Sequence, residues 1–314
     1  MTQPRKSDFH VSIVIPAYNE SGNLDICIEE IQKSLTGYTY DILFVDDGSS
    51  DQTLKELRQL SEQYMEVGYL SLSRNFGHQN ALRAGLENAK GDCIISMDAD
   101  MQHPPRLLPE LIDKWLEGYD IVQTIRKGNE KLPFFKRTTS GLFYKFINTI
   151  SEVDIEPGAA DFRLIDRKVA DVIRLIQDPT LFLRGLVPWM GFNQYQLEFE
   201  VGERHSGQSK YTFKKMLRLA LDGIMAFSIR PLRLTVIMGL ILSVAAFLYA
   251  IYALVIYLAT DQAVSGWTSL VLSVLFIGGM QLFFLGIIGE YIGKIFIAIK
   301  QRPNYIIKET SQSK

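Results

Sequence analysis

Two carboxylates that stand one residue apart, Asp98 and Asp100, close an apolar stretch of this sequence and have the chemistry of a metal site. They lie in the segment DCIISMDADMQHPP, which continues into Gln, His and two prolines. Left unpaired, two neighbouring carboxylates repel each other and resist desolvation, so a partly buried pair needs a compensating cation. A bound divalent metal would supply that charge.

The residues around this pair alternate between strand and helix patterns. Apolar runs that predict strands cover residues 11–18, 40–48, 67–74, 92–100 and 119–126. Helical patterns such as NLDICIEEIQKSL and HQNALRAGLENAK separate them. This order predicts an α/β fold built on a mostly parallel sheet.

Polar clusters follow four of these strands at their carboxyl ends: PAYNES, DDGSSD, SRNFGHQ and DADMQ. Ligands of parallel sheets bind in the crevice beyond those ends, so the clusters predict one shared site. Each cluster alone has a plainer interpretation as a turn or a helix cap. The sequence has neither GxGxxG after the first strand nor GxxxxGK[ST], which argues against a dehydrogenase-type dinucleotide site and a P-loop.

Cysteine content and the amino terminus narrow the class of protein further. Cys27 and Cys93 are far apart and lack Cys-x-x-Cys spacing, so we expect buried, reduced thiols and neither a disulfide framework nor a structural zinc. The opening MTQPRKSDFH has no apolar run, so no cleaved signal peptide is expected. We expect no nucleic-acid partner.

The last third of the chain has the composition of membrane-spanning helices. Residues 234–258 and 267–289 carry no charge, and each run is long enough to cross a hydrocarbon core of about 30 Å at about 1.5 Å per residue. The connection ATDQAVSG has no Lys or Arg, whereas basic residues flank both spans: Lys214, Lys215, Arg218, Arg230, Arg233, Lys294, Lys300, Arg302 and Lys308. This asymmetry predicts that both termini and the amino-terminal part lie on the cytosolic face of the inner (plasma) membrane.

An amphipathic pattern precedes the first span. In YTFKKMLRLALDGIMAFSIRPLR the apolar residues recur at helical spacing, which predicts a helix in the headgroup layer or, alternatively, one packed on the soluble domain. The predicted organisation is a soluble domain over 1–210, the interfacial helix over 211–230, two transmembrane helices over 231–299 and a cytosolic tail over 300–314. We expect KETSQSK, at the end of that tail, to be disordered. Gly289 and Gly293 are small residues four apart, a weak sign of helix contacts and a homo-oligomer.

The combined motifs resemble a known family. VSIVIPAYNE, DILFVDDGSSDQT, SRNFGHQNALRAGLENAKGD, MDADMQHPP and GAADFRLIDRK, in this order and before two spans, look like bacterial polyprenyl-phosphate glycosyltransferases. These belong to the family 2 glycosyltransferases, and the chain is similar also to undecaprenyl-phosphate glucosyltransferase and dolichyl-phosphate mannosyltransferase over about residues 11–302. The resemblance implies a GT-A, Rossmann-like sheet with helices on both faces. It also implies inverting transfer of one sugar from a nucleotide diphosphate to a polyprenyl phosphate.

The resemblance also implies roles for individual residues. Those expected to bind the donor nucleotide are Pro16, Tyr18, Glu20, Asp47, Asp98, Arg204, Ser209 and Lys210, the last three on a loop that closes over the diphosphate. A polybasic membrane tether is the alternative interpretation of that loop. Asp98, Asp100 and Gln102 are expected to hold Mg²⁺ or Mn²⁺, which would neutralise charge on the leaving diphosphate.

Acceptor binding and catalysis fall on a second set of residues by the same resemblance. Candidates for the acceptor phosphate are Arg126, Lys136, Arg137 and Ser140. Asp161 matches a position often proposed as the catalytic base. Because a phosphate monoester is already mostly ionised at pH 7, we expect Asp161 instead to orient the acceptor or an arginine such as Arg163. The sequence shows no metal-ligand spacing among His10, His78 and His103.

Other functions remain open at this stage. A processive polysaccharide synthase shares the early motifs, but its Gln-x-x-Arg-Trp signature is missing and two spans are too few for a translocation channel. A membrane-anchored nucleotide-sugar binding protein would keep the pocket without turnover. Among donors UDP-glucose leads, followed by UDP-N-acetylhexosamine, UDP-linked aminoarabinose and GDP-mannose, because sugar selection depends on the shape of the pocket.

Overall fold

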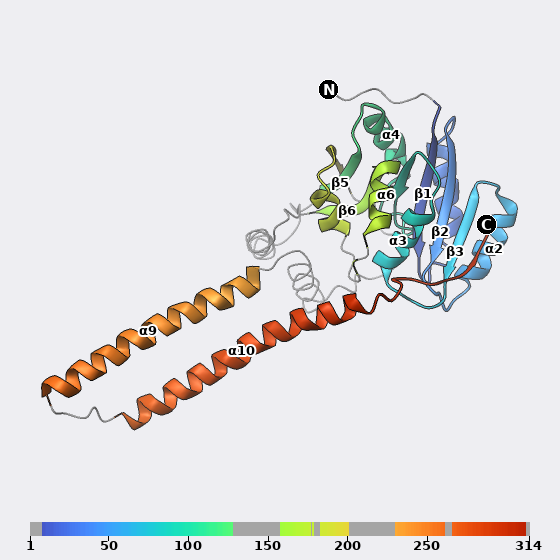
Figure 1. The fold of residues 1–314 in the computed structure, drawn as a ribbon. Coiled ribbons are helices and arrows are strands. Elements are labelled where there is room, and N and C mark those ends of the chain that lie inside the picture. Colours follow the sequence, from blue (N-terminus) through green and yellow to red (C-terminus); the bar gives the residue numbers. More distant parts are fainter. Residues whose placement is uncertain are drawn as a thin grey trace. The chain divides into compact units, whose positions relative to one another are not determined.

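The computed structural model describes residues 8–127, 158–176, 178, 183–200, 230–260 and 266–311. These residues form two compact units. One unit contains a β-sheet with its helices and includes the C-terminal segment from Gln301 onward, and the other contains two long helices (Figure 1).

The first unit is built on a sheet of eight strands in the order β7-β5-β6-β4-β1-β2-β3-β8. The strands are β1 His10–Ala17, β2 Thr39–Asp46, β3 Val67–Leu72, β4 Cys93–Ser96, β5 Ile121–Lys127, β6 Ala159–Asp166, β7 Gln194–Glu200 and β8 Ile307–Thr310. Parallel pairs join β1 to β2 and β4, β2 to β3, and β5 to β7. Antiparallel pairs join β6 to β4 and β5, and β8 to β3. The predicted parallel sheet is therefore confirmed at its centre, and its edges are mixed.

Helices cover both faces of this sheet, as predicted. They are α1 Leu24–Ser34, α2 Thr53–Gln63, α3 His78–Asn88, the 3-10 turn η1 Pro105–Leu107, α4 Leu108–Leu116, α6 Arg167–Leu175 and α7 Leu183–Trp189. Alternate residues of a strand point to opposite faces. Ile13 and Ile15 of β1 join α1, α2 and α4 in one buried cluster. Val14, which lies between them, faces α3, where a side chain at Gly85 would collide with it.

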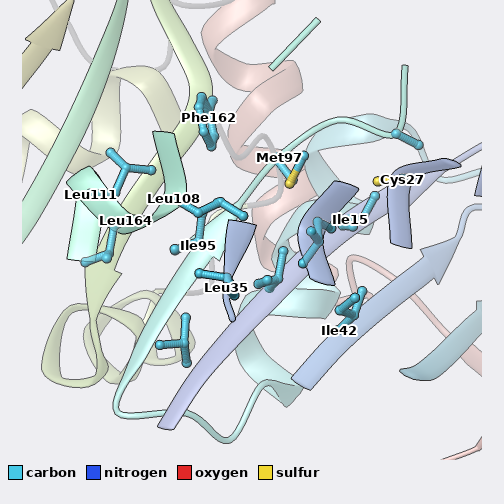
Figure 2. Close-up of a cluster of buried hydrophobic side chains, with 14 of the residues drawn as sticks. Ile15, Cys27, Leu35, Ile42, Ile95, Met97, Leu108, Leu111, Phe162 and Leu164 are labelled. Carbon is cyan, nitrogen blue, oxygen red and sulfur yellow. The ribbon is translucent and has the colours of Figure 1, made fainter. Parts of the chain in front are cut away.

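The buried cluster on the α1 face explains why these sequences form strands and helices. Figure 2 shows Ile15, Cys27 and Ile42 close to Met97, with Leu108 beyond them. All five side chains are almost completely buried. Cys27 and Cys93 are both buried, as expected, and neither is in a disulfide.

The C-terminal segment departs from the prediction of a disordered tail. Residues 307–310 form β8, which pairs antiparallel with β3, and Ser311 continues the contact by donating its backbone N–H to Tyr69. The sequence IKET carries no apolar alternation because β8 is an edge strand with mostly exposed side chains, so hydrophobic pattern alone could not reveal it.

The second unit consists of α9 Arg230–Thr260 and α10 Trp267–Ile299. Stretches of both helices, Leu232–Tyr252 and Ser269–Ile299, are long and apolar enough to cross a membrane. Pro231 lies in the first turn of α9, where a missing N–H breaks no helical hydrogen bond. The predicted interfacial helix lies outside the described residues, apart from its last residue, Arg230, which begins α9.

Candidate active site

The sheet brings the acidic residues together at the carboxyl ends of its parallel strands. The loops that carry Glu20, Asp47 and Asp98 follow the parallel strands β1, β2 and β4, so they leave the sheet on the same side. Strand β6 runs the other way and pairs Arg163 with Ser96. Asp161, two residues before Arg163, therefore lies beside Asp98, two residues after Ser96.

A tight turn presents Asp98 and Asp100. The backbone N–H of Asp98 donates to Nδ1 of His103 at 2.9 Å, and the N–H of Gln102 donates to Oδ1 of Asp100 at 3.1 Å. Met101 between them has a φ of 59°, in the left-handed region. The turn thus fixes the backbone of both aspartates, while 30% of the Asp98 side chain stays exposed.

His103 is the buried support of this turn. Its ring is fully buried, stacks on Phe162 at 5.1 Å and meets Phe199 edge-on. Burial lowers the pKa of His103, which favours the neutral imidazole that can accept the hydrogen bond from Asp98. Arg126, at the end of β5, reaches to 3.2 Å from the Nε2 of His103.

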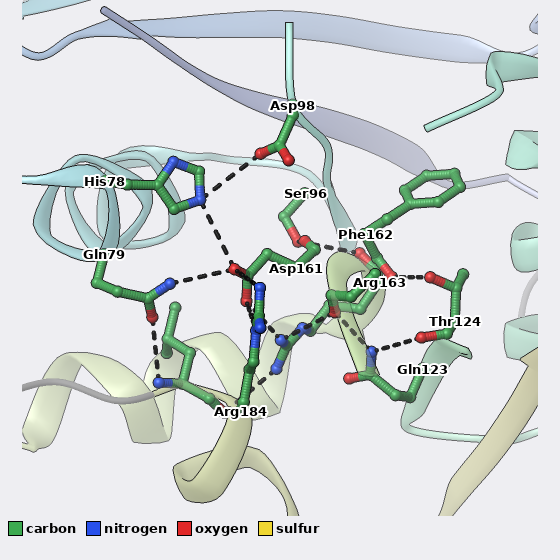
Figure 3. Close-up of polar contacts among 12 residues, drawn as sticks. His78, Gln79, Ser96, Asp98, Gln123, Thr124, Asp161, Phe162, Arg163 and Arg184 are labelled. Atoms are coloured by element: carbon green, nitrogen blue, oxygen red, sulfur yellow. Dashed lines mark hydrogen bonds and ion pairs between the residues drawn. The ribbon is translucent and has the colours of Figure 1, made fainter. Parts of the chain in front are cut away.

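His78 lies between two of the carboxylates. Its Nε2 is 3.6 Å from Oδ1 of Asp98 and 3.7 Å from Oδ2 of Asp161, as Figure 3 shows. Burial by itself would lower the pKa of His78, but the Asp161 and Asp98 carboxylates outweigh it and raise the pKa. His78 is the first residue of α3, so the start of this helix points the imidazole ring into the crevice.

Asp161 is a buried carboxylate that is neutralised by arginine. Arg163 donates to Oδ1 at 3.0 Å, and Arg184 donates to Oδ1 at 3.2 Å and to Oδ2 at 2.9 Å. Gln79 adds a fourth donor to Oδ2 at 3.2 Å (Figure 3). Burial would raise the pKa of Asp161, but Arg184, His78 and Arg163 hold it well below its usual range. A carboxylate with this low pKa and four donors is a poor proton acceptor.

Arg163 depends on this carboxylate in turn. Its side chain is buried, and burial lowers its pKa to about 10 despite the attraction of Asp161. Its other contacts are the carbonyl oxygens of Leu183 and Ala160, both at 3.2 Å. The cluster of Asp161, Arg163 and Arg184 therefore ties β6 to the start of α7.

The predicted nucleoside-binding residues surround the end of β1. Pro16 lies in β1, Tyr18 is 47% exposed, and Glu20 is partly buried and accepts from Asn23 at 2.7 Å. Burial raises the pKa of Glu20, and the nearby Asp100 and Asp98 carboxylates raise it further. The crevice therefore concentrates negative charge before any substrate arrives.

Asp47 is buried and organises the next loop. Its Oδ1 accepts from the N–H of Phe76 at 2.7 Å and its Oδ2 from the N–H of Gly77 at 2.9 Å. Gly48, with a φ of +67°, allows the two loops to touch, because a Cβ there would lie 2.5 Å from the carbonyl carbon of Arg74. Asp47 thus holds the SRNFGH loop beside the end of β2.

The structure brings some predicted site residues together and leaves others outside its range. Asp98, Asp100, Gln102, Arg126 and Asp161 converge around His103 and His78. Lys136, Arg137, Ser140, Arg204, Ser209 and Lys210 lie outside the described residues.

Sequence reasoning missed four contributors to the site: His78, Gln79, His103 and Arg184. The two histidines and Gln79 stood inside quoted motifs, where strand-end position was the available signal. Arg184 lies outside the quoted motifs, so no signal in the sequence pointed to it.

The acid pair fits a divalent cation that is completed by a substrate. Within the described part of the chain, no three His, Cys, Asp or Glu side chains gather as a metal cluster. Mg²⁺ in phosphate-handling sites usually takes one or two carboxylates, with phosphate oxygens and water as its other ligands. Asp98 and Asp100 match that donor set, so the missing third carboxylate or histidine does not argue against a metal.

A mixed Rossmann-like sheet with an acid pair beyond its fourth strand is the arrangement of GT-A glycosyltransferases. The chain belongs to glycosyl transferase family 2, which it matches over residues 12–174, and residues 230–295 match the GtrB C-terminal hairpin.

Relatives that are similar along their full length include glycosyltransferase YkcC of Bacillus subtilis, 41% identical, with 95% of this chain and 93% of that protein aligned. The bactoprenol glucosyl transferase of Shigella phage SfII is 39% identical, with 96% and 98% aligned. The prophage bactoprenol glucosyl transferase homolog of Escherichia coli is 38% identical, with 96% and 99% aligned. Among solved structures, glucosyl-3-phosphoglycerate synthase of Mycobacterium tuberculosis superposes with a TM-score of 0.45 and 18% identity, covering 70% of this chain and 77% of that one.

Proposed function

We propose that this glycosyltransferase moves a single sugar, with glucose from UDP-glucose as the first candidate, onto a polyprenyl phosphate at the cytosolic face of the membrane. The observation that carries the proposal is an acid pair, Asp98 and Asp100, in the strand-end crevice of a chain that also has two helices of membrane-spanning length. The relatives named as bactoprenol glucosyl transferases, similar over 96% of the chain, support both the lipid acceptor and glucose.

The donor side of the site is acidic and suits a nucleotide diphosphate only with a compensating cation. Tyr18 and Glu20 would contact the nucleoside, and Asp47 would hold the neighbouring loop in place. Mg²⁺ or Mn²⁺, held by Asp98, Asp100 and Gln102, would neutralise charge on the leaving diphosphate. Arg204, Ser209 and Lys210 are proposed to close over that diphosphate.

The reaction is a single displacement. An oxygen of the acceptor phosphate bonds to the anomeric carbon as the bond from that carbon to the diphosphate oxygen breaks, so the nucleoside diphosphate leaves and the configuration inverts. A phosphate monoester has a second pKa of about 6, so at pH 7 its oxygen is mostly ionised and no proton has to be removed. The work of the site is therefore to orient two anions.

This chemistry gives Asp161 a positioning role. Its four donors and depressed pKa leave it unsuited to take a proton, while it fixes the guanidinium of Arg184, of which 36% of the side chain is exposed. Arg126, Lys136, Arg137 and Ser140 are proposed to bind the acceptor phosphate. Arg126 is the member of this set whose placement is described, and it lies near His103 at the edge of the crevice.

The path of the chain supports the proposed topology. Strand β8 pairs in the same sheet as β1, although the two apolar helices lie between them in sequence. If both helices cross the membrane, the chain must leave and return on one side, which agrees with the basic flanks and the uncharged connection between the spans. We therefore place the catalytic domain and both termini in the cytosol, with the two helices in the inner (plasma) membrane.

The test is a transfer assay with purified protein and undecaprenyl phosphate. Radiolabelled UDP-glucose, UDP-N-acetylhexosamine, UDP-aminoarabinose and GDP-mannose are supplied separately, with Mg²⁺, Mn²⁺ or EDTA. The expected result is a labelled lipid from one donor, formed only with metal. Binding of UDP with no labelled lipid from any donor would contradict the proposal and favour a nucleotide-sugar binding protein.

A further inference from the structure

The segment that follows the second apolar helix is fastened to the catalytic unit along the edge of its sheet. Strand β8 pairs with β3 through the partners Leu70 with Thr310, and Ser71 with Glu309. The backbone contact extends in both directions, because Ser73 donates to the carbonyl of Ile306 at 2.8 Å and Ser311 donates to the carbonyl of Tyr69 at 3.1 Å. Figure 1 shows this segment beside β3, at the far edge of the sheet from β7.

A two-pronged ion pair fixes the register of this strand. Arg58 of α2 donates from Nε and Nη2 to the two carboxylate oxygens of Glu309 at 2.8 and 2.7 Å. The hydroxyl of Tyr69 donates to the same carboxylate at 3.2 Å. An arginine that binds both oxygens of a carboxylate adds geometric specificity, which a single point contact does not.

A second anchor lies at the end of α3. The hydroxyl of Tyr305 donates to Oε2 of Glu87 at 2.6 Å. Glu87 is held by the buried Arg83, which also donates to carbonyl oxygens of Ile176 and Asp178 beyond α6. Burial and the Glu87 carboxylate raise the pKa of Tyr305, so the hydroxyl keeps its proton and remains a donor.

These contacts are specific but bury little apolar surface. The side chains of β8 are mostly exposed, and none of residues 301–311 belongs to the hydrophobic core cluster. Burial of apolar surface is the main source of folding stability, so this segment adds little to the core. Its contacts instead determine where the chain that leaves α10 is held.

Tyr305 lies only a few residues after α10 in the sequence. Helix α3, which Tyr305 contacts through Glu87, also carries residues of the site. Four residues, Gln301 to Asn304, join Lys300 to Tyr305, so the connection can be no longer than about 18 Å when fully extended. Helix α3 carries Glu87 near one end and His78 and Gln79 at the other, about 14 Å away along the helix axis. The chain emerging from α10 is thus fixed to the helix that contacts Asp161.

We propose that residues 301–311 form a clasp that shortens the tether between the catalytic domain and the second apolar helix to the four residues 301–304, with Tyr305, Glu309 and Arg58 as positioning residues. The short tether limits how far the crevice can move from an acceptor phosphate that cannot leave the headgroup layer. The clasp rests on the proposed function, because a soluble acceptor would need no such limit. The clasp acts on the lipid substrate alone, and donor binding does not depend on it.

The test uses charge reversal and its rescue in the full-length protein, reconstituted with prenyl phosphate. Glu309→Arg and Arg58→Glu each break the ion pair, and the double variant R58E/E309R restores it in reverse. Tyr305→Phe removes only the hydroxyl of the second anchor. Lys33→Glu is the matched control, because it reverses a charge in an exposed pair within α1, where Lys33 contacts Glu30 at 2.7 Å.

We expect each single charge reversal to lower kcat/KM for prenyl phosphate about tenfold or more, since small misplacements of reacting groups have large effects. UDP affinity should not change in these variants. The double variant should regain transfer, Tyr305→Phe should lose less than Glu309→Arg, and Lys33→Glu should match the wild type. Single variants with wild-type transfer would overturn the proposal, as would a parallel loss of UDP affinity, which would make the segment a support of the fold only.

Hydrogen exchange separates this proposal from the proposed function. The amides of β8 should be protected in the wild type and exposed in Glu309→Arg, whichever donor the enzyme uses. Unprotected amides in the wild type would overturn the clasp. A wild-type protein that protects β8 but labels no prenyl phosphate would instead refute the proposed function, and with it the positioning role.

Discussion

Two acidic groups lie side by side at the edge of the sheet, and their surroundings differ. Asp161 is buried and receives donors from Arg163, Arg184 and Gln79. Asp98 is partly exposed. Among the described residues its partners are the imidazoles of His78 and His103, and no arginine or lysine contacts it. Within the described parts of the chain, Asp161 therefore has arginine partners that compensate its charge, and Asp98 has none.

This difference separates a structural carboxylate from a ligand-binding one. A buried charge persists only when partners compensate it, and Asp161 has such partners within the fold. Asp98 contacts no arginine or lysine among the described residues, so a metal bound to a diphosphate would compensate its charge. The same residue type therefore serves two roles in adjacent positions, set by the number of cations within reach.

Removal of one acid of the proposed metal site should have the largest effect on activity. Asp100→Ala is expected to lower transfer at least about a hundredfold, because several kcal/mol of charge stabilisation on the leaving group are lost. Its thermal unfolding should stay close to that of the wild type, because Asp100 is only partly buried. Asp171→Asn, an exposed acid on α6, is the control and should transfer normally. Near-normal transfer by Asp100→Ala would remove the metal site.

Removal of the compensated acid should act mainly on stability. Asp161→Asn leaves the guanidinium of Arg163 buried without its carboxylate, which is expected to cost about 3–5 kcal/mol in the free energy of unfolding. Transfer should fall moderately and not vanish. Urea unfolding followed by the fluorescence of buried Trp115 measures this cost. A D161L/R163M variant that regains stability would show that the loss comes from the unpaired guanidinium of Arg163. An Asp161→Asn variant as stable as the wild type would contradict the assignment.

The loop contact at Gly48 should have a smaller, local effect. Gly48→Ala places a Cβ against the backbone of Arg74 in addition to the cost of a positive φ, which is about 1–2 kcal/mol. Gly191→Ala is the matched control, because Gly191 has a φ of +70° and open space around it. UDP affinity measured by calorimetry should fall in the first variant only. Equal affinities would mean that the Asp47 loop does not shape the nucleotide site.

The pH profile should show no contribution from Asp161. Its folded-state pKa is depressed, so its stabilising effect is present above the unfolded pKa of about 3.9 and is lost as pH falls through the folded pKa. Between pH 5 and pH 8 Asp161 stays ionised, and kcat/KM should rise with ionisation of the acceptor phosphate, at a pKa of about 6. Asp161→Asn should keep the midpoint of that rise. A rise that disappears in Asp161→Asn would identify it as a base.

The centre of the fold was predictable from sequence, and its edges were not. Strands β1 to β5 have apolar runs followed by turn residues, so hydrophobic pattern places them within a few residues. Strand β6 lies in a segment that could be interpreted only as a motif, and β8 is a polar edge strand. Their pairing depends on contacts with distant segments, which no local pattern encodes.

The residues of the candidate site were also predictable only in part. Asp98, Asp100 and Asp161 stood in recognisable motifs, and the structure places Asp98 beside Asp161. The partners of Asp161 could not be read from spacing, because Gln79 and Arg184 are 82 and 23 residues away from it and meet it only through the packing of α3 and α7. What distinguishes the two carboxylates is therefore a property of the folded chain.

The most direct test is UDP binding to the wild type, Asp98→Asn, Asp100→Asn and Asp161→Asn, titrated in Mn²⁺ and in EDTA. We predict metal-dependent binding by the wild type and by Asp161→Asn, and loss of the metal dependence in both variants of the acid pair. Equal affinity in EDTA and Mn²⁺ for the wild type would contradict the assignment of Asp98 and Asp100 as the acids completed by a cation. Loss of metal dependence in Asp161→Asn would show that the two carboxylates do not differ in role.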